Sequence, residues 1–239
     1  MSYFDKMSAT WSDRYRRNGH FRKRLATALS WLEADSSQLQ LLDFGCGSGV
    51  LIGELLALGH NVYGVDSSAG MIEQSKQRFK QNPLLSLELL TSDDFSGEYL
   101  RRTFDGIFCL GVIEYVDNAE LLVKRLASVI KPNGFLVMSV PNQASLLRRV
   151  ERFIYNQRQT FRYIPRFKHL TDKENYLQFQ KHQFTRNSLN QLSETFGLVP
   201  RKYSYQVAPL LMNSLAGQAA IGMTLFVKYR KTEESGASG

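Results

Sequence analysis

Hydrophobic and polar positions alternate between two patterns from Leu39 to Val140. Short apolar runs of strand length are followed by longer stretches in which apolar residues recur at helical spacing. The apolar runs cover 41–44, 62–65, 85–90, 106–110 and 135–140, and the helical stretches cover 50–58, 71–79 and 119–130. Strands that alternate with helices imply right-handed crossovers. The pattern therefore predicts an α/β fold with a doubly wound, mostly parallel sheet.

The alternation stops after Pro141, where residues 142–181 are rich in Arg, Gln, Phe and Tyr and are interpreted as an insertion. A helix over 186–196 and strands over 198–207 and 221–229 are predicted after it. Residues 203–227 carry no charge and are about long enough to span a bilayer. Polar residues, a proline and two glycines interrupt this stretch, so two strands around an apolar connection are the favoured interpretation.

Composition excludes several classes of protein. A chain of 239 residues with 43% hydrophobic residues can bury an ordinary core, so disorder and a disulfide-stapled mini-protein are excluded. The two cysteines, Cys46 and Cys109, form neither a CxxC motif nor a Cys/His cluster, which argues against a metal site and fits a reducing compartment. No apolar signal segment follows Met1, and we expect a cytoplasmic protein.

The net charge of +8 is unevenly placed. Residues 1–24 hold seven Lys/Arg and two Asp (+5), and residues 148–173 hold eight Lys/Arg and two acids (+6), so the remainder is 8 − 11 = −3. Two basic segments beside a slightly acidic remainder suggest that these segments meet the substrate or a polyanion.

The sharpest chemical signal is Asp43-Phe44-Gly45-Cys46-Gly47-Ser48-Gly49, between an apolar strand and a helix. Glycines at such a bend allow positive φ and let a ligand approach the backbone, while the following helix offers free N–H groups. A dinucleotide fingerprint would need glycine where Val50 stands, so a smaller cofactor fits better.

Asp66 is the second signal, because it closes the second predicted strand 21 residues after Gly45. A carboxylate at this spacing, at the carboxyl end of the neighbouring strand, can accept hydrogen bonds from ribose hydroxyls. The two signals together predict a nucleoside cofactor.

At this point the chain resembles the class I S-adenosylmethionine-dependent methyltransferases, and most of all small-molecule members such as the ubiquinone-pathway O-methyltransferases. The resemblance rests on four segments in family order, namely 42–49, 62–66, 104–116 and 130–136. It implies a Rossmann-like methyltransferase fold of seven strands with the last strand antiparallel, and S-adenosyl-L-methionine as the cofactor.

The resemblance also implies roles for matching positions. Asp43 and the turn would face the methionine moiety, Asp66 the ribose, and Asp93 the adenine amino group, with Asp94 left as the alternative to Asp93. Arg24 flanks the apolar face of a predicted helix over 21–32, where its guanidinium could bind the methionine carboxylate; an arginine that only covers apolar surface is the alternative. The expected cofactor contacts are Tyr15, Arg24, Asp43, Gly45, Cys46, Gly47, Asp66, Ser67, Met71, Asp93, Asp94, Phe95 and Leu110.

The base that would take a proton from the acceptor is not identified by the sequence. Tyr115 stands where the family often has histidine, so an imidazole is not supplied there. His169, His182 and His20 are the candidates, whereas His60 lies in a turn expected at the opposite end of the sheet.

The segments are interpreted as one domain over residues 1–231. Its expected parts are an N-terminal helical cap (1–35), a cofactor-binding half (36–141), a lid insertion (142–181) and a closing helix with two strands (182–231), with a disordered tail (232–239). The chain leaves the fifth strand at the ligand edge of the sheet, so the insertion is placed to cover the acceptor.

Three functions remain open. The favoured one is methyl transfer to O or N of a small, aromatic or anionic metabolite. An RNA base methyltransferase and a nucleoside-binding protein without transfer activity are the alternatives. The insertion interleaves arginines with aromatic rings, a pattern that suits single-stranded RNA, an anionic membrane or an acidic aromatic molecule. No RNA-binding module accompanies it, so no specific nucleic acid is expected.

Overall fold

The computed structural model describes residues 19–32, 37–167, 176–206 and 220–232. Tyr15, His169 and residues 233–239 of the tail lie outside the described residues. The elements in chain order are α2 (Gly19–Leu29), β1 (Gln40–Phe44), α3 (Val50–Ala57), β2 (Asn61–Asp66), α4 (Ala69–Phe79), β3 (Leu85–Leu89), the 3₁₀ helix η1 (Glu98–Arg101), β4 (Phe104–Leu110), α5 (Ala119–Ser128), β5 (Ile130–Pro141), α6 (Leu146–Asn156), α7 (Arg158–Phe161), η2 (Pro165–Phe167), η3 (Tyr176–Phe179), α9 (Arg186–Glu194), β6 (Leu198–Gln206) and β7 (Thr224–Lys231).

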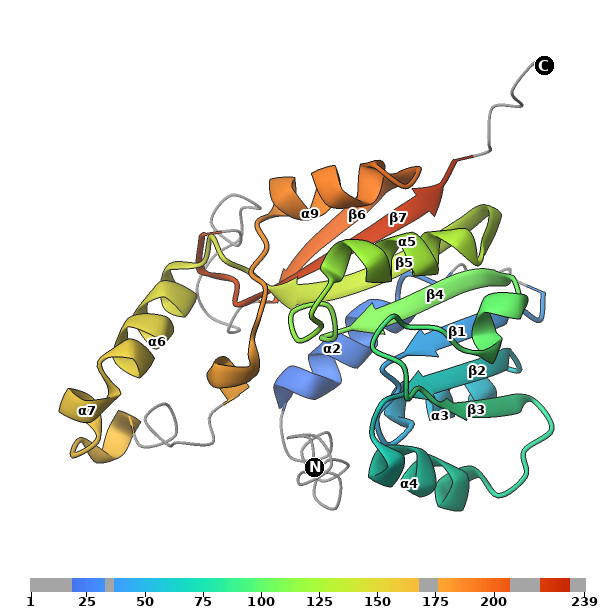
Figure 1. The fold of residues 1–239 in the computed structure, drawn as a ribbon, viewed down its shortest axis with the longest axis horizontal. Helices are drawn as coiled ribbons and strands as arrows, with labels where there is room; N and C mark the ends of the chain where they lie inside the picture. Colours follow the sequence, from blue (N-terminus) through green and yellow to red (C-terminus); the bar gives the residue numbers. More distant parts are fainter. Residues whose placement is uncertain (1–18, 33–36, 168–175, 207–219, 233–239) are drawn as a thin grey trace.

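The strands form one sheet in the order β3-β2-β1-β4-β5-β7-β6 (Figure 1). β1 to β5 pair in parallel, and β7 pairs antiparallel with both β5 and β6. The predicted α/β fold with seven strands and an antiparallel last strand is confirmed.

Side chains on the two faces of the sheet belong to two separate clusters. Leu42 and Ile107 pack in the cluster that includes the apolar faces of α5 and α9, whereas Leu41 and Phe108 pack in the cluster that includes those of α2 and α3. Neighbouring residues of a strand point to opposite faces, so a continuous apolar run can fill both clusters. This double burial explains why the predicted strands read as unbroken apolar runs.

The start of β7 differs from the prediction. A strand was expected from Ile221, but β7 begins at Thr224 because three preceding carbonyls are bonded elsewhere. The Asn142 side chain donates to Gly222 O (2.8 Å), and the Arg148 guanidinium Nε donates to Met223 O (3.1 Å). Ser145 Oγ donates to Ile221 O (3.1 Å). The start of the insertion therefore takes the place of a strand partner for residues 221–223.

The uncharged stretch 203–227 contains the end of β6 and the beginning of β7, as predicted. Its connection, 207–219, falls outside the described residues. Among the helices that the structure describes, none is long and apolar enough to cross a membrane.

Candidate active site

A cavity of about 1130 Å³ opens at the carboxyl ends of β1, β2, β4 and β5. Parallel strands end at the same edge of a sheet, which is where ligands of doubly wound folds bind. The predicted contacts that line it are Arg24, Gly45, Cys46, Gly47, Asp66, Ser67, Met71, Asp93, Phe95 and Leu110. The fold thus brings together residues from four strand ends and the N-terminal helix.

The glycine turn between β1 and α3 has the backbone that its sequence requires. Gly45, Gly47 and Gly49 have φ of 79°, 54° and 74°, values that side chains disfavour. A Cβ on Gly45 would lie 2.3 Å from a methyl group of Val112, so this glycine also permits close packing against the chain after β4. The turn thus exposes its backbone along one wall of the cavity.

Asp66 is held in place by two backbone N–H groups, one in the glycine turn and one just after β2. Its Oδ2 accepts from Gly47 N (2.8 Å), and its Oδ1 accepts from Ser68 N (2.9 Å). These two bonds fix the orientation of the carboxylate. The carboxylate is half-buried at the cavity wall.

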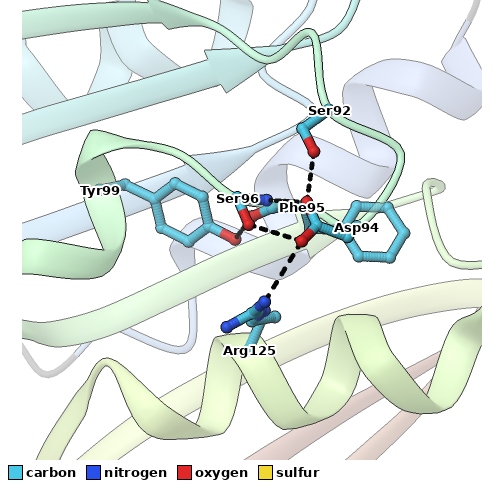
Figure 2. Close-up of polar contacts among 6 residues, drawn as sticks. All are labelled: Ser92, Asp94, Phe95, Ser96, Tyr99 and Arg125. Atoms are coloured by element: carbon cyan, nitrogen blue, oxygen red, sulfur yellow. Dashed lines mark hydrogen bonds and ion pairs between the residues drawn. The ribbon is translucent and has the colours of Figure 1, made fainter.

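The loop after β3 gives the adjacent carboxylates Asp93 and Asp94 different surroundings. Figure 2 shows Asp94 accepting from the hydroxyls of Ser92 and Ser96 and pairing with Arg125. These hydroxyl bonds lower the pKa of Asp94 to about 2. Asp93 and Phe95 line the cavity, whereas Asp94 lies outside its lining. Asp94 therefore stabilises the loop. Of the two carboxylates that the sequence left as alternatives, Asp93 is the one that lies at the cavity.

Arg24 reaches the cavity from α2. Its Nη1 lies 3.4 Å from the Leu110 carbonyl oxygen, and its guanidinium covers Gly111, where a Cβ would lie 2.5 Å from Nη1. Arg24 is half-buried and Lys23 is exposed, as the helix-face argument predicted. A guanidinium thus stands at the end of β4, beside the glycine turn.

Asp43 and Cys46 show how burial sets the charge of the turn. Asp43 is buried outside the cavity lining, and Asp43 Oδ2 has no hydrogen-bond partner among the described residues. Burial, followed by the charge of Asp66, raises the pKa of Asp43 to about 8. Burial also raises the pKa of the Cys46 thiol, so this cysteine is a thiol rather than a nucleophilic thiolate at neutral pH.

Sequence reasoning missed the far end of the cavity. It is lined by Glu114, Ser139 and Gln180, each with one buried polar atom that lacks a hydrogen-bond partner among the described residues. Burial raises the pKa of Glu114 to about 7, and the charges of Arg24 and Arg148 act to lower it. We call this end, formed by Glu114, Tyr115, Ser139, Arg148, Gln180 and Lys181, the acceptor end.

The acceptor end is assembled by contacts distant in sequence. Lys181 N and His182 N both donate to Glu114 O, at 2.7 and 3.1 Å. Arg152 Nη2 donates to Gln180 Oε1 at 3.1 Å. The signal that could have found them is that Glu114 follows β4 by four residues and that Ser139 lies two residues before the end of β5.

Comparison with known proteins agrees with this architecture. A family model described as a methyltransferase domain matches residues 10–202. The chain belongs to the class I S-adenosylmethionine-dependent methyltransferases. The family resemblance predicted from the four sequence segments is therefore confirmed, and the predicted cofactor is the one that names this family.

Curated relatives of this methyltransferase include ubiquinone biosynthesis O-methyltransferases. Those of Rickettsia felis and Schizosaccharomyces pombe are 34% identical over 115 and 110 residues, which cover 46% of this chain and 44% and 40% of the relatives. The chain thus spans less than half the length of these two. The Rhodopseudomonas palustris protein is 28% identical over 254 residues, covering 97% of this chain and 90% of the relative.

Solved structures show the same fold. Magnesium protoporphyrin IX methyltransferase from Synechocystis PCC 6803 superposes with a TM-score of 0.67 at 18% identity, covering 95% of this chain and 97% of that one. The N-methyltransferase NodS from Bradyrhizobium japonicum WM9 gives 0.61 at 18% identity, covering 92% and 91%. These likenesses confirm the Rossmann-like methyltransferase fold.

The two histidines whose side chains the structure describes, His60 and His182, lie away from the cavity wall. His182 is absent from the lining, and its Nε2 lies 3.2 Å from the Asp117 carbonyl oxygen. His60 is buried at the start of β2, the opposite end of the sheet, as expected. His169 and the side chain of His20 are outside the described residues. The imidazole candidates His20 and His169 stay untested, whereas His182 is not placed to act in this structure.

Among the described residues of the insertion, those that meet the cavity lie toward its two ends. Arg148 and residues 178–181 line the acceptor end, whereas none of the residues 152–167 does. Residues 152–167 therefore do not cover this cavity in the structure, and the lid over 142–181 stays a prediction. Figure 1 shows α6 and α7 extending away from the sheet.

Metal-ligand side chains do not gather in the described part of the chain. No three His, Cys, Asp or Glu side chains there are close enough to hold an ion together.

Proposed function

We propose that this methyltransferase transfers a methyl group from S-adenosylmethionine to an oxygen or nitrogen atom of a small metabolite that is aromatic or anionic. The observation that carries the proposal is Asp66, a carboxylate fixed by Gly47 N and Ser68 N at the wall of a large cavity. The names of the ubiquinone biosynthesis relatives favour oxygen as the accepting atom. The cytoplasmic location stays a prediction.

The residues present fit the cofactor. The glycine turn is a cradle whose backbone faces the cavity, because Gly45 and Gly47 take positive φ, and Gly47 N fixes the Asp66 carboxylate beside it. Asp93 can accept from the adenine amino group, and Arg24 can bind the methionine carboxylate. Bound S-adenosylmethionine supplies an electrophilic methyl group on a sulfonium, which leaves as a neutral thioether.

Glu114 is placed to take the proton that the acceptor loses. Its pKa of about 7 leaves a large ionised fraction at neutral pH, where a carboxylate can act as a base. Ser139 and Gln180 supply a hydroxyl and an amide beside it, each with hydrogen-bonding capacity left over. These three groups would orient a hydroxyl or amine in line with the methyl group and exclude water from it.

The cofactor assignment is tested by calorimetric titration of S-adenosylmethionine into Asp66→Asn. Loss of charge-assisted bonds to the ribose should weaken binding about tenfold or more. Asp105→Asn is the matched control, because Asp105 also accepts from a backbone N–H, that of Gln40, and pairs with Lys131, but at the opposite edge of the sheet. Equal affinities for Asp66→Asn and wild type would contradict the assignment.

The acceptor class is tested by mass spectrometry of reactions with hydroxylated benzoates, catechols and aromatic amines. A mass gain of one methyl group on a phenol or an amine supports the proposal. Turnover of a structured RNA together with failure on every small acceptor would contradict it.

A further inference from the structure

Exposed apolar side chains gather on one part of the described chain. Eight large apolar side chains are exposed there, and six of them lie between Leu146 and Ile164. We call residues 146–167, which comprise α6, α7 and η2, the arm. The arm extends away from the sheet at one end of the molecule (Figure 1). Gathered exposed apolar residues mark an interaction surface rather than an ordinary solvent face.

Helix α6 carries a continuous apolar stripe that faces outward. Leu146, Val150 and Phe153 follow the four- and three-residue spacing of one helix face, and they are 55%, 55% and 60% exposed. Leu147 stands beside this stripe and is also exposed, whereas Ile154 is buried. This spacing is typical of a helix that packs its apolar side against a core, but in α6 most of that side is exposed to solvent.

The arm is held together by aromatic contacts. Phe153 and Phe161 meet edge to face with ring centroids 6.2 Å apart, and Phe161 and Phe167 meet at 5.6 Å. Such pairs add to the apolar burial of the rings. These contacts connect α6, α7 and η2, so the arm presents its stripe and its charges as one surface.

The arm is strongly basic. It contains six arginines and one glutamate, a net charge of +5. Arg148 pairs with Glu151, and Arg152 donates to Gln180, so these two cations serve internal contacts. Arg149, Arg162 and Arg166 are exposed, although Arg162 also donates to Gln159 Oε1 (3.3 Å) and to the Tyr163 hydroxyl within the arm.

We propose that the arm docks this methyltransferase onto the surface of an anionic lipid bilayer, with the stripe of α6 in the headgroup region and the exposed arginines against acidic headgroups. An apolar helix face combined with cationic side chains is the composition of helices that lie in a membrane interface. Each arginine near an anionic surface adds to the attraction.

Two other occupants fit the arm less well. A second copy of the chain would bring two surfaces of net charge +5 together, which repel each other. Single-stranded RNA binds through aromatic faces on which bases stack, whereas Leu146 and Val150 of the stripe offer no such face. The combination of an aliphatic stripe and arginines is matched by acyl chains and acidic headgroups together.

Docking would place the bilayer next to the acceptor end of the cavity. Arg148, on the polar side of α6, lines that end and bonds to Met223 O beside it. The inference does not depend on the acceptor, because it rests on surface residues that lie outside the cavity lining.

The experiment is co-sedimentation of the full chain with vesicles of phosphatidylglycerol mixed with phosphatidylcholine, compared with vesicles of phosphatidylcholine alone. We expect binding to the anionic vesicles that salt weakens, and little binding to the neutral ones. The combined variant Val150→Asn/Phe153→Ser should bind at least about tenfold more weakly. Arg149→Gln/Arg162→Gln/Arg166→Gln should lose about a hundredfold, the effect of three arginines at roughly 1 kcal/mol each.

Matched controls are available elsewhere on the surface. Leu58→Asn removes a leucine that is 59% exposed, and Arg101→Gln removes an exposed arginine; both should bind vesicles as wild type does. Unchanged thermal unfolding midpoints show that all variants are folded.

Three results would overturn the proposal. The first is equal binding to neutral and anionic vesicles. The second is anionic binding that the arm variants leave intact. The third is that the wild type does not bind vesicles but self-associates or binds RNA in the absence of lipid, and that the arm variants lose this association.

Discussion

The two ends of the cavity are built in different ways. Around Asp66 the bonds join the ends of neighbouring strands, and Gly47 N to Asp66 and Cys46 N to Val65 O each span 19 residues. At the acceptor end, bonds join residues far apart, such as Asn142 to Gly222 and Arg148 to Met223, 80 and 75 residues away. The glycine turn and Asp66 thus belong to one βαβ unit, while the acceptor end exists only after the whole chain has folded.

This difference predicts that the two ends can be impaired separately. Loss of a local glycine or carboxylate should change cofactor affinity, whereas loss of an acceptor-end group should change transfer with the cofactor still bound. Three sets of variants test this separation.

The largest effect is expected from Glu114→Gln. Without a carboxylate to take the proton, kcat should fall about a hundredfold or more, while calorimetric affinity for S-adenosylmethionine stays near that of wild type. Glu88→Gln is the control, because Glu88 accepts from the Tyr63 hydroxyl and from the backbone near Tyr99, away from the cavity lining. Its kcat should be unchanged.

The pH dependence of the wild type follows from the same residue. Glu114 acts as a base only when ionised, and its pKa is about 7, so kcat should rise as the pH passes through 7 from below. That rise should be missing from the residual activity of Glu114→Gln. A parallel rise in both proteins would assign the proton to another group and remove Glu114 from the mechanism.

A smaller effect, confined to the cofactor side, is expected from Gly45→Ala. The added Cβ meets Val112 at 2.3 Å and sits at φ 79°, so S-adenosylmethionine affinity should fall about tenfold and stability by more than the backbone cost alone. Gly59→Ala isolates that backbone cost, because Gly59 has φ 83° and a Cβ added there would meet no atom within 4 Å. It should lose about 1–2 kcal/mol of stability and keep its affinity.

Equal losses of affinity in Gly45→Ala and Gly59→Ala would show that general destabilisation, and not the cradle, explains the binding defect. Isothermal titration and thermal unfolding of the two proteins, measured side by side, decide between these outcomes.

The smallest change in activity is expected from Asp43→Asn, whose effect is on stability. The folded-state pKa of Asp43, about 8, lies above its unfolded value near 4, so the folded protein retains a proton that the unfolded chain has lost. Stability therefore falls as pH rises from about 4 to 8, by up to about 1.4 kcal/mol per unit. Asp43→Asn lacks this titration and should gain stability relative to wild type across that window.

Asp94→Asn tests a contribution to stability that has the opposite dependence on pH. Hydroxyl bonds from Ser92 and Ser96 lower the pKa of Asp94 to about 2, so its contribution is present above pH 4 and is lost as the pH falls through 2. Denaturation midpoints measured from pH 2 to pH 8 would refute both assignments if the two variants tracked wild type in parallel.

The sheet and the cofactor side of this protein could be predicted from the amino-acid sequence. Burial on both faces makes the central strands β1, β2, β4 and β5 read largely as apolar runs, and residues 43–49 form the glycine turn through neighbours in the chain. Asp66 could be placed because parallel strands end at one edge. These features depend on local spacing and on one topological rule, which a single sequence records.

The acceptor end and the arm, in contrast, depend on how the complete chain packs. Glu114 and Gln180 become neighbours of one cavity through backbone and side-chain bonds that no spacing predicts, and the choice between Asp93 and Asp94 depended on which carboxylate the Ser92 and Ser96 hydroxyls capture. An amphipathic pattern such as that of α6 is the same whether its apolar stripe faces a core or solvent. Which of the two it faces follows from the folded chain as a whole, because burial is a relation between segments distant in sequence.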